Sequence, residues 1–205
     1  MLPALALLLC ALPVGQQAPD AAAPVADVRK ELPLRPPAES MLRIHRGGVW
    51  LVRGESIERL TRVDGSRRVE GAAYIELGAG GEIELAWPGL ASLRVTGPAA
   101  LEWTPSASAP NEGAVQLYRF RRLEAEVRRG RRDLRLPQGW NLSLARGAVH
   151  AEERVTGDVL VHHRGGADAH LTSRAQREAK LPDKVRSGQR LLLPRLPDER
   201  ERPTR

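Results

Sequence analysis

The sequence predicts an all-β protein, because apolar residues recur at every second position and tight turns separate the apolar runs. In one run Ile83, Leu85 and Trp87 alternate with Glu82 and Glu84. A period of two is typical of a strand that buries one face. The same pattern recurs in four later runs: Leu93 with Val95, Leu101 with Trp103, Leu123 with Ala125 and Val127, and Trp140 with Leu142 and Leu144.

Turn residues divide the chain into short segments. The turn signals are Asp64-Gly65, Gly78 to Gly81, Pro88-Gly89, Gly97-Pro98, Arg129-Gly130, Pro137 to Gly139, Thr156 to Asp158, Gly165-Gly166 and Ser187-Gly188. We therefore expect about ten short strands joined by tight turns. Such strands bury their apolar faces by stacking two sheets or by coiling, which predicts a sandwich, a jelly roll or a β-solenoid. A short helix is expected over Thr172 to Ala179, and Trp87, Trp103 and Trp140 should be buried.

Four segments of different composition are expected along the chain. Residues 1–15 contain the apolar run Leu2 to Val14, which is shorter than the about 20 residues of a membrane-spanning helix and is typical of a signal peptide. Residues 16–40 form a Pro/Ala-rich linker, residues 41–194 the β domain, and residues 195–205 a charged, disordered tail. The protein is therefore expected outside the cytoplasm, in the periplasm or secreted, with no transmembrane helix.

Composition excludes several classes of function. The single cysteine, Cys10, lies in the first apolar run, so the β domain has no disulfide framework, cysteine-ligated zinc or cysteine nucleophile. The formal charge of +7 comes almost entirely from arginines that are interleaved with glutamates, and aromatic residues are only 3% of the chain. Too few rings are present for a base-stacking platform, so we expect no specific nucleic-acid partner.

Several stretches of the chain resemble the FecR-type periplasmic domain over about residues 45 to 194. They are Gly80 to Gly89, Leu93 to Pro98, Leu123 to Gly130, Trp140 to His150, Gly157 to Val161 and Ser187 to Leu191. FecR-like proteins often pass a signal to a sigma factor through a cytoplasmic segment and a spanning helix, and we do not expect either in this sequence. The resemblance thus implies a free-standing exported domain that binds another protein or an envelope polymer.

Arginines gather around Gly130 and suggest a surface for an anionic ligand. Arg128, Arg129, Arg131 and Arg132 flank this glycine directly, and Arg119, Arg121, Arg122 and Arg135 lie nearby in the sequence. A hairpin tip of this kind could bind phosphate or an acidic polymer through bidentate guanidinium contacts. The alternative is a solvated tip whose arginines pair with Glu124, Glu126 and Asp133.

A late segment carries residues of the types that bind metal ions. They are His150, Glu152, Glu153, His162, His163 and His170. A turn at Thr156 to Asp158 would place Glu152 nearly opposite His162. Adjacent His162 and His163 would point to opposite faces of a strand, however, and no zinc-ligand spacing is present, so we predict no metal site and no cofactor.

Paired carboxylates are the remaining candidates for catalysis. Glu82 with Glu84, and Glu124 with Glu126, each lie on one face of a predicted strand, a spacing that glycosidase acids could use. Outward-facing glutamates give the same pattern, and the chain has no Gly-x-Ser-x-Gly nucleophile motif. We therefore predict a non-enzymatic binding domain. The alternative is a small metal-dependent or sugar-active β enzyme of the cell envelope.

Overall fold

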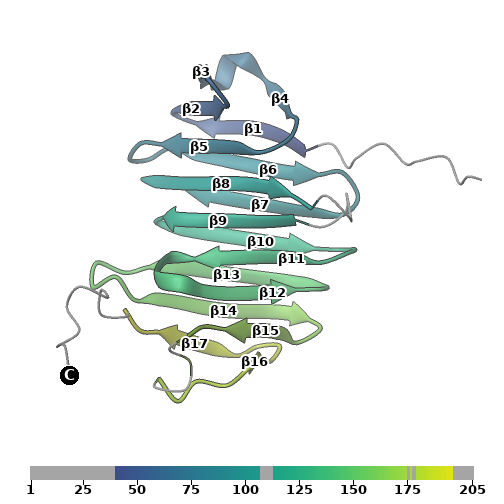
Figure 1. Ribbon diagram of the computed structural model, residues 1–205, viewed down its shortest axis with the longest axis vertical. Coiled ribbons are helices and arrows are strands. Elements are labelled where there is room, and N and C mark those ends of the chain that lie inside the picture. Colours follow the sequence, from purple (N-terminus) through teal and green to yellow (C-terminus); the bar gives the residue numbers. More distant parts are fainter. Residues whose placement is uncertain (1–39, 107–112, 175, 177–178, 196–205) are drawn as a thin grey trace, which may run out of the picture. The chain divides into compact units, whose positions relative to one another are not determined.

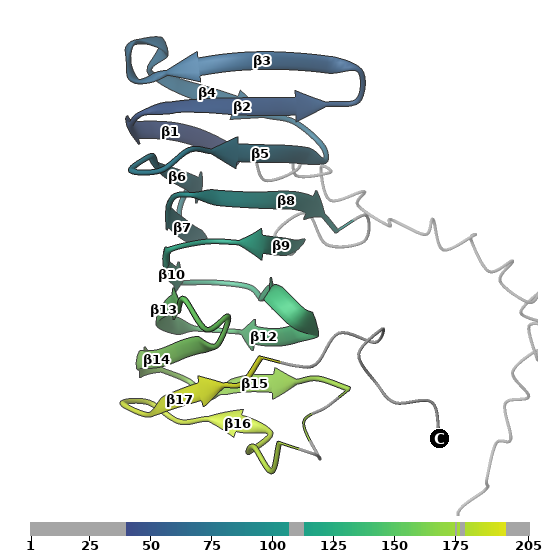
Figure 2. The ribbon, with the colours of Figure 1, turned by 90° about the vertical axis from the view of Figure 1, so that its left-hand side faces the viewer.

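Two largely antiparallel sheets pack face to face in the β domain, as the computed structural model shows (Figures 1 and 2). The structure describes residues 40–106, 113–174, 176 and 179–195. These residues form seventeen strands and two short 3-10 helices, with no α-helix among them. The predicted all-β class is confirmed, and the arrangement is that of an open sandwich.

The eight-stranded sheet, here called sheet A, has the following strands from one edge to the other: β17 (Arg190–Leu193), β14 (Val159–Gly166), β13 (Gly147–Glu153), β10 (Arg122–Val127), β7 (Ala91–Thr96), β6 (Glu82–Trp87), β1 (Ser40–Arg46) and β4 (Ser66–Val69). The nine-stranded sheet, sheet B, has β16 (Lys184–Val185), β15 (Ala169–Thr172), β12 (Trp140–Leu144), β11 (Arg132–Leu136), β9 (Gly113–Arg119), β8 (Ala99–Pro105), β5 (Ala73–Leu77), β2 (Gly48–Arg53) and β3 (Ser56–Thr61). The 3-10 helices are η1 (Arg62–Asp64) and η2 (Pro137–Gly139).

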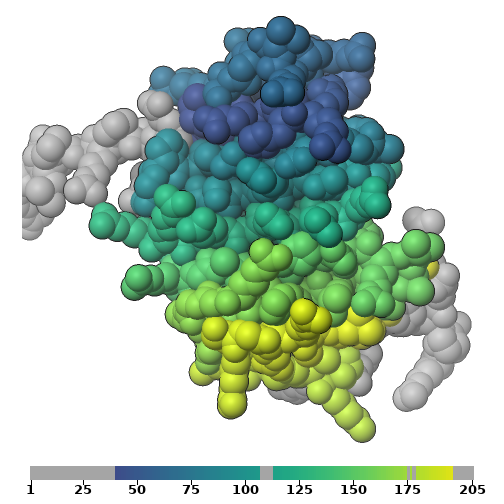
Figure 3. Space-filling view, turned by 180° about the vertical axis from the view of Figure 1, so that it is seen from behind, coloured from purple at the N-terminus to yellow at the C-terminus, as the bar shows by residue number. Residues whose placement is uncertain are grey.

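The chain alternates between the two sheets as it advances through the domain. After β6 and β7 in sheet A it forms β8 and β9 in sheet B, then β10 in sheet A and β11 in sheet B. Because β10 lies between them in the sequence but in the other sheet, β9 and β11 run parallel, whereas the neighbouring β8–β9 and β11–β12 pairs are antiparallel. The surface therefore shows bands that follow the sequence from one end of the domain to the other (Figure 3).

The predicted number of strands, about ten, was too low. The alternation of apolar and polar residues is clear only in strands with several inward apolar residues, and it fails in edge strands. Strand β4 has the sequence Ser-Arg-Arg-Val with one buried residue, and β16 has only two residues. Both pair with a neighbour through their backbones, which the side-chain pattern does not reveal.

The core between the sheets is built on the predicted tryptophans. Trp87, Trp103 and Trp140 are each at most 2% exposed, which confirms their prediction. Trp87 comes from sheet A and Trp103 from sheet B, and their ring centroids are 4.7 Å apart. The Trp140 indole donates a hydrogen bond to the Pro194 carbonyl at 3.2 Å. These contacts join the two sheets at their inner faces.

The helix predicted over Thr172 to Ala179 is not found among the described residues. Thr172 is the last residue of β15, and Arg174, Gln176 and Ala179 lie in turns. The segment is shorter than an isolated helix needs, so its composition cannot compensate for nucleation. The Gln176 side chain instead donates a hydrogen bond to the carbonyl of Pro182 at 3.1 Å.

The predicted boundaries of the β domain are close to those found. Ser40 already belongs to β1, one residue before the predicted start. Arg195, placed in the predicted tail, donates its backbone N–H to Asp158 at 2.8 Å. The predicted signal peptide, the rest of the linker and residues 196–205 lie outside the described residues. No helix in the described part of the chain is long and apolar enough to cross a membrane.

Candidate functional site

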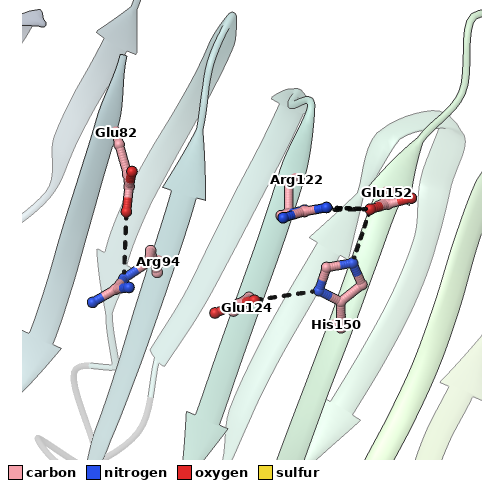
Figure 4. A network of polar contacts seen from close by, with 6 residues as sticks. All are labelled: Glu82, Arg94, Arg122, Glu124, His150 and Glu152. Carbon is pink, nitrogen blue, oxygen red and sulfur yellow. Dashed lines mark hydrogen bonds and ion pairs between the residues drawn. The ribbon is translucent and has the colours of Figure 1, made fainter. Parts of the chain in front are cut away.

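The outer face of sheet A carries a network of opposite charges that crosses the strands (Figure 4). Arg122 pairs with Glu152 at 3.0 Å, and His150 contacts Glu152 at 3.1 Å and Glu124 at 3.5 Å. Arg94 lies 3.7 Å from Glu82. The register of β10 and β13 places Arg122 opposite Glu152 and Glu124 opposite His150, whereas Glu82 on β6 is diagonal to Arg94 on β7. The face is therefore a ladder of cross-strand ion pairs.

The predicted carboxylate pairs lie in this ladder and its continuation. Glu82 and Glu84 are half-buried, and Glu84 contacts His45 on β1 at 3.1 Å. Glu126, at the other side of the face, pairs with Arg128 at 2.9 Å. These carboxylates lie on the outer face of sheet A and pair with cations, an arrangement that serves solubility and sheet pairing.

Within the ladder, the neighbouring cations change the pKa of the Glu152 carboxyl. Hydrogen bonds from His150 and from Arg122 lower the pKa of the Glu152 carboxyl below its ordinary value of 4.5. The carboxylate form is therefore favoured in the folded protein, and Glu152 contributes stability above its unfolded pKa that is lost as the pH falls through its folded pKa.

We expect the substitution Glu152→Gln to reduce the free energy of unfolding at neutral pH by less than about 1 kcal/mol, because Glu152 and Arg122 are both solvent-exposed. The difference from the unchanged protein should shrink as the pH falls below 4.5, where the carboxyl of the unchanged protein also becomes neutral. Urea unfolding at pH 7, 5 and about 3 measures this. Glu55→Gln, in the turn between β2 and β3, is the control. A Glu152→Gln deficit that stays constant with pH would contradict the assignment.

The histidines and glutamates of metal-binding type are placed only in part as predicted. The turn after β13 is centred on Thr156, so His162 lies opposite His150, and Glu152 lies opposite Leu160. The predicted pairing of Glu152 with His162 is therefore wrong by two residues. Strand β14 does send His162 outward and His163 into the core, where His163 is fully buried.

No group of three His, Cys, Asp or Glu side chains in the described part of the chain could hold a metal ion. The separation of His162 from His163 across β14 explains part of this. His170 lies on β15 in the other sheet. Burial, followed by the nearby charges of Arg190 and Arg164, lowers the pKa of His162. Its imidazole is therefore favoured in the neutral form.

The arginine cluster around Gly130 is a corner between the sheets and not a hairpin tip. Strand β10 ends in sheet A and β11 begins in sheet B, so Arg128 to Arg131 cross from one layer to the other. Arg128 pairs with Glu126, and Arg131 pairs with Asp133 at 3.2 Å, which are two of the alternative pairings predicted from the sequence. Arg128, Arg129 and Arg131 are exposed, and their binding of an anion stays a prediction.

Arg132 does not belong to that surface, because it is only 2% exposed. It shares the inward phase of β11 with Leu134 and Leu136. Its guanidinium lies 4.8 Å from the Trp87 ring centroid, and its Nη1 donates to the backbone carbonyl of Arg131 at 2.9 Å. The cation therefore packs against the indole between the sheets, as in a cation–π contact.

The outer face of sheet B carries an exposed aromatic cluster that sequence reasoning missed. All seven aromatic residues of the chain are described, and four of them are buried. The other three lie on the outer face of sheet B: Trp50 on β2, Tyr74 on β5 and Tyr118 on β9. With the neighbouring aliphatic residues Val52 and Ile57, we call them the aromatic face.

Contacts within sheet B hold these rings in place. The ring centroids of Tyr74 and Tyr118 are 6.1 Å apart, and the Tyr118 hydroxyl donates to Glu102 at 2.8 Å. This hydrogen bond raises the pKa of Tyr118, so the hydroxyl stays protonated. The Arg59 guanidinium lies 5.7 Å from the Trp50 ring. Each ring therefore projects from a strand of sheet B and contacts another ring or a charged side chain.

The sequence did contain a signal for this face. Val49 and Leu51 take the inward phase of β2, so Trp50 between them must point outward. Likewise, Val115 and Leu117 are buried and place Tyr118 outside.

Comparison of the chain with protein-family models, with curated protein sequences and with solved structures found no significant match.

Proposed function

We propose that this protein is an exported, non-enzymatic FecR-like domain that binds a protein or a polymer of the cell envelope through the aromatic face. The observation that carries the proposal is the exposure of Trp50, Ile57 and Tyr118, which are 48%, 66% and 52% exposed on one sheet. Exposed apolar side chains that gather on one face mark interaction sites more often than scattered ones do.

The residue types of this face support binding. Trp, Tyr and Arg are the side chains that most often dominate binding energies. The rings of Tyr74 and Tyr118 contact each other at a tilted angle, and the strands below the face, β2, β5, β8 and β9, are hydrogen-bonded neighbours in sheet B. The contact between Tyr74 and Tyr118 and the hydrogen bond of Tyr118 to Glu102 reduce the freedom that these two side chains lose when a partner is bound, which favours affinity.

The ion pairs on sheet A support a non-enzymatic role over the sugar-active or metal-dependent alternative. A general acid needs a carboxyl group whose pKa is raised toward the working pH. The carboxyl groups of Glu126 and Glu152 have pKa values lowered by their partners, and both face solvent. The resemblance of the Gly-turn segments to the FecR-type domain supports a periplasmic or secreted binding role.

The experiment is retention of envelope components on the immobilised full chain. We expect at least one protein or polymer from a detergent extract of the envelope to be retained, and to be lost with the double variant Trp50→Ala/Tyr118→Ala. The double variant Glu124→Gln/Glu126→Gln, on the opposite sheet, is the matched control and should retain it. No retained component, or equal retention by the aromatic variant, would contradict the proposal.

A further inference from the structure

We infer that the partner of the aromatic face is a neutral polysaccharide chain, an inference that rests on the proposed function. The rings of Trp50, Tyr74 and Tyr118 come from three strands of one sheet and share its outer side. Pyranose rings present patches of C–H groups that pack on aromatic rings, while their hydroxyls stay at the rim. Rings on β2, β5 and β9 of one sheet give such a chain successive places to stack.

Hydrogen-bonding groups lie beside the rings. Glu102 accepts a hydrogen bond from the Tyr118 hydroxyl, and the register places Glu102 opposite both Tyr74 and Gln116. The carboxylate is half-buried and has oxygen lone pairs beyond those that Tyr118 uses. Glu76 lies opposite Trp50 and pairs with Arg119. A carboxylate, an amide and a guanidinium next to the rings match the hydroxyl pairs of a sugar.

The charge around the rings argues for a neutral ligand. The chain as a whole has a net charge of +7, whereas the aromatic face is balanced: Arg59 and Arg119 are offset by Glu76 and Glu102. A polyanion gains affinity from unpaired cations that displace its counterions. The exposed arginines of the Gly130 corner lie next to Gly113, at the end of β9 away from Tyr118.

The same polar groups disfavour a protein partner. The core of a protein–protein interface is depleted in charged residues, because charges buried there lose their water. On the aromatic face, Glu102 is bonded to Tyr118 and Glu76 lies opposite Trp50, so a dry interface over the rings would bury two carboxylates as well. A sugar chain supplies hydroxyls and retained water to these groups.

The test is a titration of the full chain with soluble polysaccharides. The neutral probes are hydroxyethyl cellulose, glucomannan and laminarin, and the anionic probes are polygalacturonate and heparin. Trp50 reports binding, since it is the exposed tryptophan while Trp87, Trp103 and Trp140 are buried. We expect at least one neutral polymer to change the fluorescence and to retard the protein in affinity electrophoresis.

The variants identify the surface. Trp50→Ala or Tyr118→Ala should weaken binding about tenfold or more in affinity electrophoresis, as expected for a lost stacking partner. Tyr118→Phe keeps the ring and should retain most of the affinity. Glu124→Gln/Glu126→Gln on sheet A should bind like the unchanged protein. Binding of neutral polymers that is unaffected by the ring variants would overturn the inference.

Other outcomes separate this inference from the proposed function. If envelope retention depends on the aromatic face but only a protein is retained and no neutral polymer binds, the inference is overturned and the proposed function stands. A mass by light scattering that halves in Trp50→Ala/Tyr118→Ala would make a second copy of the chain the occupant and would overturn the inference. Binding of polyanions alone would do the same. If nothing from the envelope is retained, both proposals fail.

Discussion

Replacing Trp103 by alanine should reduce the free energy of unfolding by about 3–5 kcal/mol, the range for deletion of a large buried side chain. Trp103 is 2% exposed and its ring contacts Trp87 from the opposite sheet at a centroid distance of 4.7 Å. The Arg132 guanidinium lies 5.8 Å from the same ring. The substitution therefore opens a cavity and removes packing that joins the two sheets.

Urea unfolding followed by circular dichroism measures this loss, and Trp50→Ala is the matched control. Trp50 is 48% exposed on the outer face of sheet B, so its removal should cost less than about 1 kcal/mol. The same substitution thus tests two positions that differ in burial. A loss below about 1 kcal/mol for Trp103→Ala would contradict the role given to the tryptophan pair.

The fold class could be predicted from the sequence because strand phase depends on side chains alone. Ile83, Leu85 and Trp87 are all buried, as their spacing predicted. The division of strands between two sheets could not be predicted, since it depends on backbone pairings between distant segments. Residues of β1 pair with β6 and with β4, and no local pattern in Ser40–Arg46 selects those partners.

In the candidate sites, too, strand phase could be predicted from the side chains and strand pairing could not. Arg132 was assigned to a surface because of its charged neighbours, although its spacing from Leu134 and Leu136 already gave the inward phase. The register of His150 with His162 depends on the five residues between β13 and β14, whose turn includes a hydrogen bond from the Arg154 N–H to the Asp158 carbonyl. A turn of this length has several geometries, so the sequence could not fix the pairing.

The two outer faces of the sandwich carry different kinds of side chain. Sheet A presents ion pairs that satisfy one another, as between Arg122 and Glu152, and sheet B presents rings. The self-pairing of sheet A leaves few groups there that gain by binding a partner. This division explains why a basic chain with 3% aromatic residues can still offer an aromatic surface.

Gly147→Ala, at the junction of β13 and β14, should reduce the free energy of unfolding by about 3 kcal/mol or more. Gly147 has φ +142°, a conformation essentially restricted to glycine. A Cβ added there would lie 2.3 Å from the Gly165 carbonyl oxygen and 3.0 Å from the ring of buried His163. A backbone oxygen cannot rotate away as a side chain can, so strands β13 and β14 would have to separate.

The control is Gly54→Ala, in the turn between β2 and β3. Gly54 also has a positive φ, +56°, but its added Cβ would meet no atom within 4 Å. Its substitution should therefore cost only the left-handed conformation of an alanine, about 1–2 kcal/mol. The chemical change is the same in both variants, so the difference between their urea unfolding free energies reports the backbone conformation and the close approach at Gly147 together. Equal losses in the two variants would show that β13 and β14 are not held together at Gly147 in the way described, whereas failure of Gly147→Ala alone to fold would agree with it.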